Sequence, residues 1–215
     1  MSDGAENQMS VQVKICGVTR VDDALAAVDA GADLIGLNFY PPSPRYARLE
    51  RAVAISRAVA GRAKLVGVFV GAAHELVAGI CGELKLDFVQ LYSDEEVDAV
   101  FDLPVEVIRA FRLKPGHSRA AVAGLCARTR AEYILLDSYD PKLYGGIGRA
   151  LALGDLEGID LSRAFIAGGL RPETVAEAAR LEPYGVDVAS GVESSPGVKD
   201  HLKLRSFIRN AKSSR

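Results

Sequence analysis

The sequence alternates short apolar runs with amphipathic stretches eight times, and this rhythm limits the folds open to the chain. Val, Ile and Leu dominate the short runs, without the polar–apolar alternation of a half-exposed strand. Such runs are typical of parallel strands that are buried on both faces. We therefore predict a single α/β domain, a compact (β/α)8 TIM barrel, over residues 11–215. The main alternative is an open, doubly wound parallel sheet.

The expected elements follow the apolar periodicity and the Gly and Pro residues that interrupt it. The strands are expected at residues 11–15, 33–39, 64–70, 87–91, 105–111, 132–136, 164–167 and 186–189. The helices are expected at residues 21–30, 49–60, 73–82, 118–128, 172–181 and 199–211, with another opening at Ser93 and a weak helical segment at 151–156. Thr19 is expected to cap the first helix, and Pro172 to begin the seventh.

Composition excludes several classes of protein. The chain has 215 residues, 49% of them hydrophobic, and a formal net charge of −2, which argues against disorder and against a nucleic-acid partner. Residues 1–10 are polar and are expected to form a flexible tail rather than a signal peptide. No apolar run approaches the length of a membrane span. Three cysteines without a Cys-x-x-Cys pair indicate a reducing cytoplasm and no metal site.

Glycines follow the seventh and eighth expected strands. In (β/α)8 barrels the active site lies at the carboxyl ends of the strands, and phosphate commonly binds after strands seven and eight. Here these ends read Gly168-Gly169 and Ser190-Gly191. Glycine lets backbone N–H groups approach an anion closely. A pair of glycines can also mark only a tight turn, but two such ends in adjacent units predict a phosphate site.

One thiol and one carboxylate follow two other strands. Cys16 ends the first strand and Asp137 the sixth. A thiol with a depressed pKa can accept a proton, and a carboxyl group with a raised pKa can donate one. Together they could move protons on a sugar phosphate. The alternative is that Cys16 is a small core residue and Asp137 caps a loop. Structural roles are expected for the remaining cysteines and the histidines, which lie in or beside helices: Cys81, Cys126, His74, His117 and His201.

Arg45 lies in the proline-rich loop Pro41-Pro42-Ser43-Pro44 that follows the second strand. Proline fixes φ and restricts the residue before it, so this loop is expected to be stiff. A guanidinium held in one place can bind a carboxylate through two parallel hydrogen bonds. The alternative is that Arg45 forms a surface ion pair.

Several of these motifs resemble one family, the phosphoribosylanthranilate isomerases of tryptophan biosynthesis. The resemblance begins with Lys14-Ile15-Cys16-Gly17 and the run GLNFYPPSPRY at residues 36–46. It continues in order through VGVFV at 66–70, VQL at 89–91, Leu136-Asp137 and YGGIG at 144–148. It ends with AGGL at 167–170, GVDVASGVE at 185–193 and the segment 196–200.

The resemblance implies an Amadori rearrangement of N-(5-phosphoribosyl)anthranilate, without metal or cofactor. It implies that Asp137 is the general acid that opens the ribose ring and that Cys16 is the base that removes the proton from C2. Arg45 would hold the anthranilate carboxylate. The other substrate-binding residues would be Gln90, Tyr92, Gly145, Gly146, Gly168, Gly169, Ser190 and Gly191. The partner would be a small phosphorylated substrate, with no nucleic acid or membrane, and the protein would be a monomer or a homodimer.

The sequence departs from the family pattern at three points. Tyr92 stands where the family usually has His, and Ile147 stands where a hydroxyl residue is usual in the glycine loop. The usual aromatic-x-Trp after that loop is missing, because the chain has no Trp. Two other functions are therefore considered: a phosphate-ligand-binding barrel with impaired catalysis, and an isomerase for a related aminoaldose phosphate.

Overall fold

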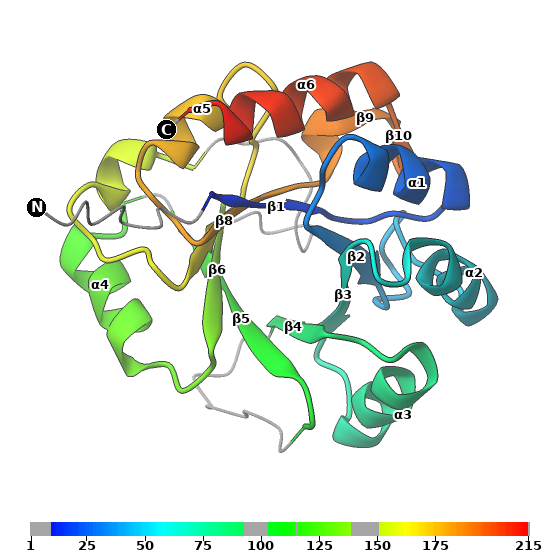
Figure 1. Ribbon diagram of the computed structural model, residues 1–215. Helices are drawn as coiled ribbons and strands as arrows, with labels where there is room; N and C mark the ends of the chain where they lie inside the picture. Colours follow the sequence, from blue (N-terminus) through cyan, green and yellow to red (C-terminus); the bar gives the residue numbers. More distant parts are fainter. Residues whose placement is uncertain (1–9, 93–102, 115, 139–150, 215) are drawn as a thin grey trace, which may run out of the picture.

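Eight parallel strands close into a barrel in the computed structural model, which describes residues 10–92, 103–114, 116–138 and 151–214. Each strand pairs with its neighbours in sequence order, and the last pairs back to the first (Figure 1). The strands are β1 (Gln12–Ile15), β2 (Leu34–Asn38), β3 (Lys64–Val70), β4 (Phe88–Tyr92), β5 (Glu106–Leu113), β6 (Tyr133–Ser138), β7 (Ala164–Ile166) and β8 (Gly185–Val188). The predicted barrel is confirmed, and the open-sheet alternative is wrong.

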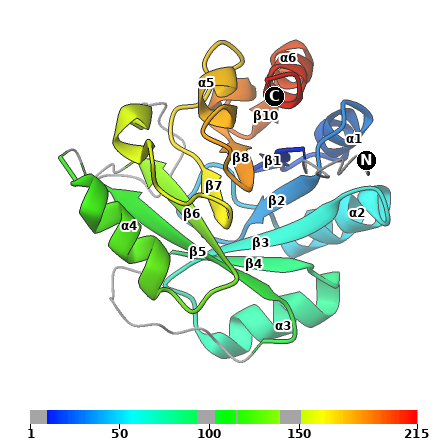
Figure 2. The same cartoon turned by 60° about the vertical axis from the view of Figure 1, so that its left-hand side comes forward.

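The helices lie outside the strands (Figures 1 and 2). They are α1 (Val21–Asp29), α2 (Leu49–Val59), α3 (His74–Leu84), α4 (Arg119–Arg128), α5 (Val175–Ala179) and α6 (His201–Lys212). Two 3-10 turns, η1 (Leu153–Leu156) and η2 (Ser190–Val192), and a small antiparallel pair, β9 (Glu193–Ser195) and β10 (Val198–Lys199), complete the described elements. Within the described part, no helix combines the length and apolarity needed to cross a membrane.

All eight expected strands are found within two residues of their expected bounds. The errors are at helix ends. Thr19 does not cap α1; its hydroxyl donates to the Gly197 carbonyl (2.6 Å) instead. The chain at Pro172 forms turns, so α5 starts only at Val175. The helix expected to open at Ser93 lies outside the described residues, as does the tail at 1–9.

The start of α6 was also placed too early. Lys199 belongs to β10, and α6 begins at His201. Asp200 caps this helix, because its carboxylate accepts hydrogen bonds from the backbone N–H groups of Leu202 and Lys203. The weak segment expected at 151–156 is the short turn η1. At Thr19 and Lys199 a local side-chain or strand contact overrides helical periodicity.

Two apolar layers hold the barrel. One lies between the strands and the helices and includes the outward-facing Val13 and Ile15 of β1. The other fills the barrel interior and includes Val66, Ile108 and Leu135. At the amino ends of the strands, aromatic rings pack against one another and fill the barrel: Phe88, Tyr133, Phe165 and Tyr184. The polar residues that line the pocket lie at the opposite, carboxyl end of the strands.

Gly185 makes room for this aromatic cluster, and we expect its substitution to destabilise the fold. A Cβ at Gly185 would lie 2.6 Å from the Phe165 ring and 2.8 Å from the Gln12 carbonyl oxygen. Gly185→Ala should therefore lower the free energy of unfolding by about 1–3 kcal/mol. The control Gly79→Ala, within α3 with no atom near the added Cβ, should raise it by about 0.4–1 kcal/mol. Urea denaturation of both variants checks this; similar effects from the two would contradict the packing described.

Candidate active site

A pocket opens at the carboxyl ends of the strands, and every predicted site residue within the described part lines it. Strands far apart in sequence deliver these side chains to one place, as the barrel topology requires. They are Cys16, Arg45, Gln90, Tyr92, Asp137, Gly168, Gly169, Ser190 and Gly191. Gly145 and Gly146, predicted to bind substrate, lie outside the described residues, as does Ile147. The two other cysteines and all three histidines do not line this pocket.

Cys16 lies directly above a buried ion pair that was not predicted as part of the site. Lys14 on β1 donates from Nζ to Oδ1 of Asp187 on β8 (2.7 Å), and the Lys14 side chain is completely buried. The two residues are register partners where β8 pairs with β1. Because successive side chains of a strand alternate between its faces, Lys14 and Cys16 face the barrel interior together. A Cβ at Gly36 would contact both Lys14 Nζ (3.2 Å) and Cys16 Sγ (3.1 Å).

The electrostatic surroundings of Cys16 act in opposite directions. Burial raises the pKa of the thiol, the Lys14 and Lys199 ammonium groups lower it, and the Asp187 carboxylate raises it. The net result is a pKa above the ordinary value for cysteine. The pKa is raised because the loss of hydration around a buried thiolate outweighs the effect of the two cations. The thiol is protonated at neutral pH in the free protein.

Asp137 is buried on β6 and has a strongly shifted pKa. Burial is the main cause and the Asp187 carboxylate adds to it, so the pKa of Asp137 rises to about 6. The Tyr92 hydroxyl donates to Asp137 Oδ2 (3.1 Å) and, with a backbone hydrogen bond at Ser138 and the Lys14 charge, limits the rise. Tyr92, the residue that departs from the family pattern, thus contacts the predicted acid directly. A carboxyl group in this range can donate a proton near neutral pH.

Gln90 presents a buried amide to the pocket. The side chain is 1% exposed, and neither its Oε1 nor its Nε2 has a hydrogen-bond partner among the described residues. Its strand neighbours in register are Val68 and Ile108, which are apolar. A buried amide without partners costs free energy unless a ligand or water satisfies it. The amide is therefore suited to bind a polar group of a ligand in this pocket.

Arg45 lies against the turn that follows Cys16. A Cβ at Gly17 would approach Arg45 Cδ to 2.5 Å, and Gly17 has a φ of +69° that favours glycine. Ser43 accepts a hydrogen bond from the Arg45 backbone N–H (3.2 Å) within the proline loop. The guanidinium pairs with Glu193 (2.7 Å), and both residues are 8% exposed. Arg45 does form an ion pair, as the alternative expected, but this pair is buried rather than at the surface.

The glycines after β7 and β8 bring backbone segments into close contact. Gly168 and Gly169 have φ values of +85° and +70°. A Cβ at Gly168 would lie 2.6 Å from the Ser138 nitrogen, and one at Gly191 would lie 1.9 Å from the Leu170 carbonyl oxygen. Any side chain at these positions would clash with backbone, so glycine is required for this end of the pocket to form. The result is a pocket wall made of backbone, as an anion site needs.

The sequence analysis did not identify four buried charged residues at or beside the pocket: Lys14, Asp187, Glu193 and Lys199. All four are less than 9% exposed. A signal was available for two of them, since a Lys two residues before Cys16 and an Asp inside an apolar strand are unusual unless paired. Among the described residues, no group of three potential metal ligands occurs.

Comparisons with known proteins agree with this geometry. A model of the N-(5'-phosphoribosyl)anthranilate isomerase family matches residues 13–210. N-(5'-phosphoribosyl)anthranilate isomerase of Myxococcus xanthus is 44% identical over 208 residues, which cover 95% of this chain and 98% of that protein. The enzyme of Pseudomonas fluorescens is 43% identical over 201 residues, or 93% and 97% of the two chains.

Solved structures of the same family superpose on the barrel. Phosphoribosyl anthranilate isomerase from Thermus thermophilus is 36% identical, with a TM-score of 0.83 over 95% of this chain and 100% of that one. A second isomerase structure, in complex with reduced 1-(o-carboxyphenylamino)-1-deoxyribulose 5-phosphate, is 35% identical with a TM-score of 0.77, over 94% and 98% of the two chains. The chain belongs to the family of N-(5'-phosphoribosyl)anthranilate isomerases.

Proposed function

We propose that this chain catalyses the Amadori rearrangement of N-(5'-phosphoribosyl)anthranilate to 1-(2-carboxyphenylamino)-1-deoxyribulose 5-phosphate in tryptophan biosynthesis. The observation that supports this most strongly is the meeting of Cys16 and Asp137 in one pocket, above a buried ion pair and beside a glycine-lined wall. The reaction needs one group to donate a proton and another to remove one, and the pocket supplies both.

Asp137 is the general acid in this proposal. It protonates the ring oxygen of the ribose, the bond between that oxygen and C1 breaks, and the nitrogen lone pair forms a Schiff base with C1. With a pKa of about 6, Asp137 retains a proton in part of the molecules at neutral pH. An ordinary aspartate would be almost entirely ionised there.

Cys16 is the general base. The thiolate removes the proton from C2, and the C–H electron pair forms a C1–C2 double bond while the Schiff base accepts electrons, giving an enolamine. Tautomerisation of the enolamine yields the ketone. Lys14 lies beside the thiol and favours the thiolate, so it stabilises the form that acts as base. Oxidation of C2 is balanced by reduction of C1 within the same molecule, and the residues described move only protons.

The remaining residues bind the two ends of the substrate. Arg45 would hold the anthranilate carboxylate, and the backbone at Gly168, Gly169, Ser190 and Gly191 would hold the phosphate. Gln90 and Tyr92 would contact the sugar between them, where the Gln90 amide would gain hydrogen bonds. Gly145 and Gly146 remain predicted substrate-binding residues.

We also propose a cytoplasmic location and a small phosphorylated substrate as the partner, with no nucleic-acid or membrane partner. All three cysteines are free, which fits a reducing compartment. One similar isomerase structure, from Thermotoga maritima, is described as monomers generated from a dimeric enzyme. For this chain we propose a monomer or a homodimer.

A binding barrel with impaired catalysis is the second candidate, because Tyr92 replaces the usual His. The contact between Tyr92 and Asp137 favours activity instead, since it keeps a hydrogen bond to the acid. An aminoaldose isomerase of different specificity is the third candidate. Arg45 argues against it, because a buried guanidinium at the pocket suits a substrate that bears a carboxylate. An unchanged Michaelis constant for phosphoribosylanthranilate in Arg45→Ala would contradict this role of Arg45.

Turnover of phosphoribosylanthranilate, followed by the loss of its fluorescence, tests the proposed reaction. Wild type should turn over, and Cys16→Ala and Asp137→Asn should each lose about 10²–10⁴-fold in kcat, the usual contribution of a general acid or base. Cys126→Ala, a cysteine on α4 outside the pocket, should retain wild-type activity. An inactive wild type that still binds phosphate compounds would support the impaired barrel and sink the proposed reaction.

The dependence of kcat/KM on pH should be bell-shaped. The lower of the two pKa values, that of Asp137 or that of Cys16, sets the rising limb, and the higher one sets the falling limb. Activity requires protonated Asp137 and ionised Cys16, yet the pKa of Asp137 is about 6 and that of Cys16 lies above the ordinary cysteine value. The rate should therefore rise with pH up to the pKa of Asp137, stay level, and fall above the pKa of Cys16.

Tyr92→Phe identifies the lower limb of this profile. Removing the Tyr92 hydroxyl removes a hydrogen bond that lowers the pKa of Asp137, so the lower limb should move to higher pH. A limb that came from the substrate's own phosphate would not move. An unchanged lower limb in Tyr92→Phe would rule out its assignment to Asp137.

A further inference from the structure

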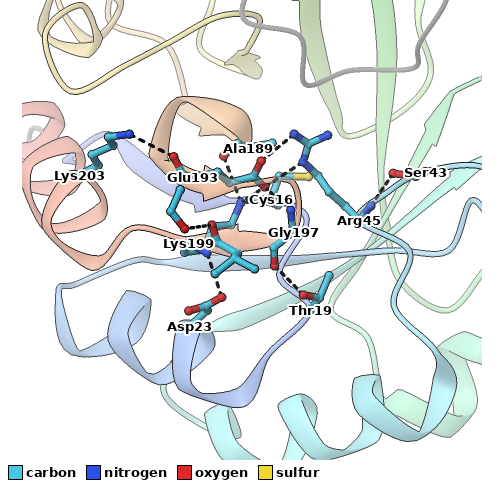
Figure 3. A network of polar contacts seen from close by, with 12 residues as sticks. Cys16, Thr19, Asp23, Ser43, Arg45, Ala189, Glu193, Gly197, Lys199 and Lys203 are labelled. Carbon is cyan, nitrogen blue, oxygen red and sulfur yellow. Dashed lines mark hydrogen bonds and ion pairs between the residues drawn. The ribbon is translucent and has the colours of Figure 1, made fainter.

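Lys199 of β10 places its ammonium group at the junction between the ends of β1 and β8 (Figure 3). Its Nζ donates to the Cys16 carbonyl (2.7 Å), just after β1, to the Ala189 carbonyl (3.1 Å), just after β8, and to Glu193 Oε1 (3.0 Å). The Lys199 side chain is completely buried. These three acceptors match the three protons of an ammonium group. Lys199 therefore joins the ends of two barrel strands at one point.

This contact takes the place of the next hydrogen bond between the two strands. The β1–β8 ladder ends with the register pair Ile15 and Val188, followed by a bond from the Cys16 N–H to the Val188 carbonyl (2.8 Å). In a regular parallel ladder the next bond would join the Ser190 N–H to the Cys16 carbonyl. Instead Ser190 begins the turn η2, and the Cys16 carbonyl accepts from Lys199. A side chain thus continues the strand contact where the backbone ladder stops.

Glu193 allows the ammonium group to be buried here. Burial raises the pKa of Glu193, but hydrogen bonds and charges from Arg45 and Lys199 bring this pKa below its ordinary value, so Glu193 is ionised. Burial lowers the pKa of Lys199, and the Glu193 carboxylate opposes this change. A buried ion pair is tolerated when further hydrogen bonds satisfy its remaining protons. The carbonyls of Cys16 and Ala189 supply those bonds.

Neighbouring contacts fix Lys199 relative to η2. The Lys199 backbone N–H donates to Asp23 Oδ2 on α1 (3.0 Å). The next residue, Asp200, donates from its backbone N–H to the carbonyl of Val192, the last residue of η2 (2.9 Å). Two consecutive residues thus hold η2 at both ends, since Lys199 binds Ala189 directly before it. The turn η2 therefore keeps a set position relative to the end of β1.

We propose that Lys199 is a positioning residue that sets the distance between Cys16 and the backbone at Ser190 and Gly191. The inference rests on the proposed function, in which this backbone holds the phosphate while Cys16 removes the proton from C2 of the same substrate. A misplacement of about 1 Å between such groups can cost about 10²-fold in rate. Lys199 is not among the described residues that line the pocket, so it acts through the backbone and does not touch the substrate.

Turnover of phosphoribosylanthranilate and its inhibition by inorganic phosphate, measured on the same variants, test this role. Lys199→Met keeps the length of the side chain but removes its three donors. Lys203→Met is the matched control, because Lys203 Nζ donates to the Glu193 backbone carbonyl (3.1 Å) rather than to the strand ends. The loss of substrate fluorescence gives kcat and KM, and competition with the substrate gives the inhibition constant of inorganic phosphate.

Lys199→Met should lose about 10–100-fold in kcat, while KM and the inhibition constant of phosphate stay within about threefold of wild type. The phosphate end would still bind, but C2 would no longer be aligned with the base. Lys203→Met should match wild type in all three quantities. A merely structural role of Lys199 would lower the free energy of unfolding and leave kcat of the folded protein unchanged.

Lys199→Arg separates position from charge. The Lys199 charge lowers the pKa of Cys16 against the larger effect of burial, and Arg keeps this charge beside Glu193. A planar guanidinium cannot direct three N–H groups from one nitrogen toward the three acceptors. The falling limb of the pH profile should therefore stay at its wild-type pH while kcat still falls. The same variant replaces Lys199→Met if that protein does not fold.

Four results would overturn the proposal: wild-type kcat in Lys199→Met, wild-type kcat in Lys199→Arg, an equal loss in Lys203→Met, or phosphate binding that weakens in step with kcat. A wild type that does not turn over phosphoribosylanthranilate would contradict the proposed function itself. Wild-type kinetics in the Lys199 variants, with an active wild type, would contradict only the positioning role.

Discussion

The buried ion pair between Lys14 and Asp187 is the interaction on which the site depends. It spans the seam where β8 pairs with β1 and closes the barrel. Burial alone would lower the pKa of Lys14, but Asp187 and Cys16 raise it above the ordinary value, so Lys14 stays charged. Two such charges are tolerated in the barrel interior only as a pair, because either alone would be an uncompensated buried ion.

This pair also affects the pKa values of the two proposed catalytic groups. The Asp187 carboxylate raises the pKa of Asp137, and the Lys14 ammonium lowers the pKa of Cys16 against the larger effect of burial. The proposed reaction needs a protonated acid and an ionised base. Asp187 favours protonated Asp137 and Lys14 favours ionised Cys16, while each acts in the opposite direction on the other group. The same two residues thus pair where the barrel closes and influence the pKa of both proposed catalytic groups.

The fold could be predicted because periodicity is a local property of the chain. Cys16 and Asp137 could be assigned to the pocket, because a barrel brings the carboxyl ends of all its strands together. The partners of these residues could not be found, since Lys14 and Asp187 lie 173 positions apart in sequence and Arg45 and Glu193 lie 148 apart. The direction of the Cys16 pKa shift depends on burial against two cations, which only the three-dimensional arrangement gives.

Titration of the Cys16 thiol, followed by thiolate absorbance, tests whether Lys14 sets its pKa. It compares wild type with Lys14→Met, both in a Cys81→Ser, Cys126→Ser background. Met keeps the length of the side chain and removes the charge. We predict a Cys16 pKa above the ordinary cysteine value in wild type and a still higher pKa in Lys14→Met. The same pKa in both proteins, with the barrel intact by circular dichroism, would contradict a role for the ion pair in setting the chemistry of the pocket.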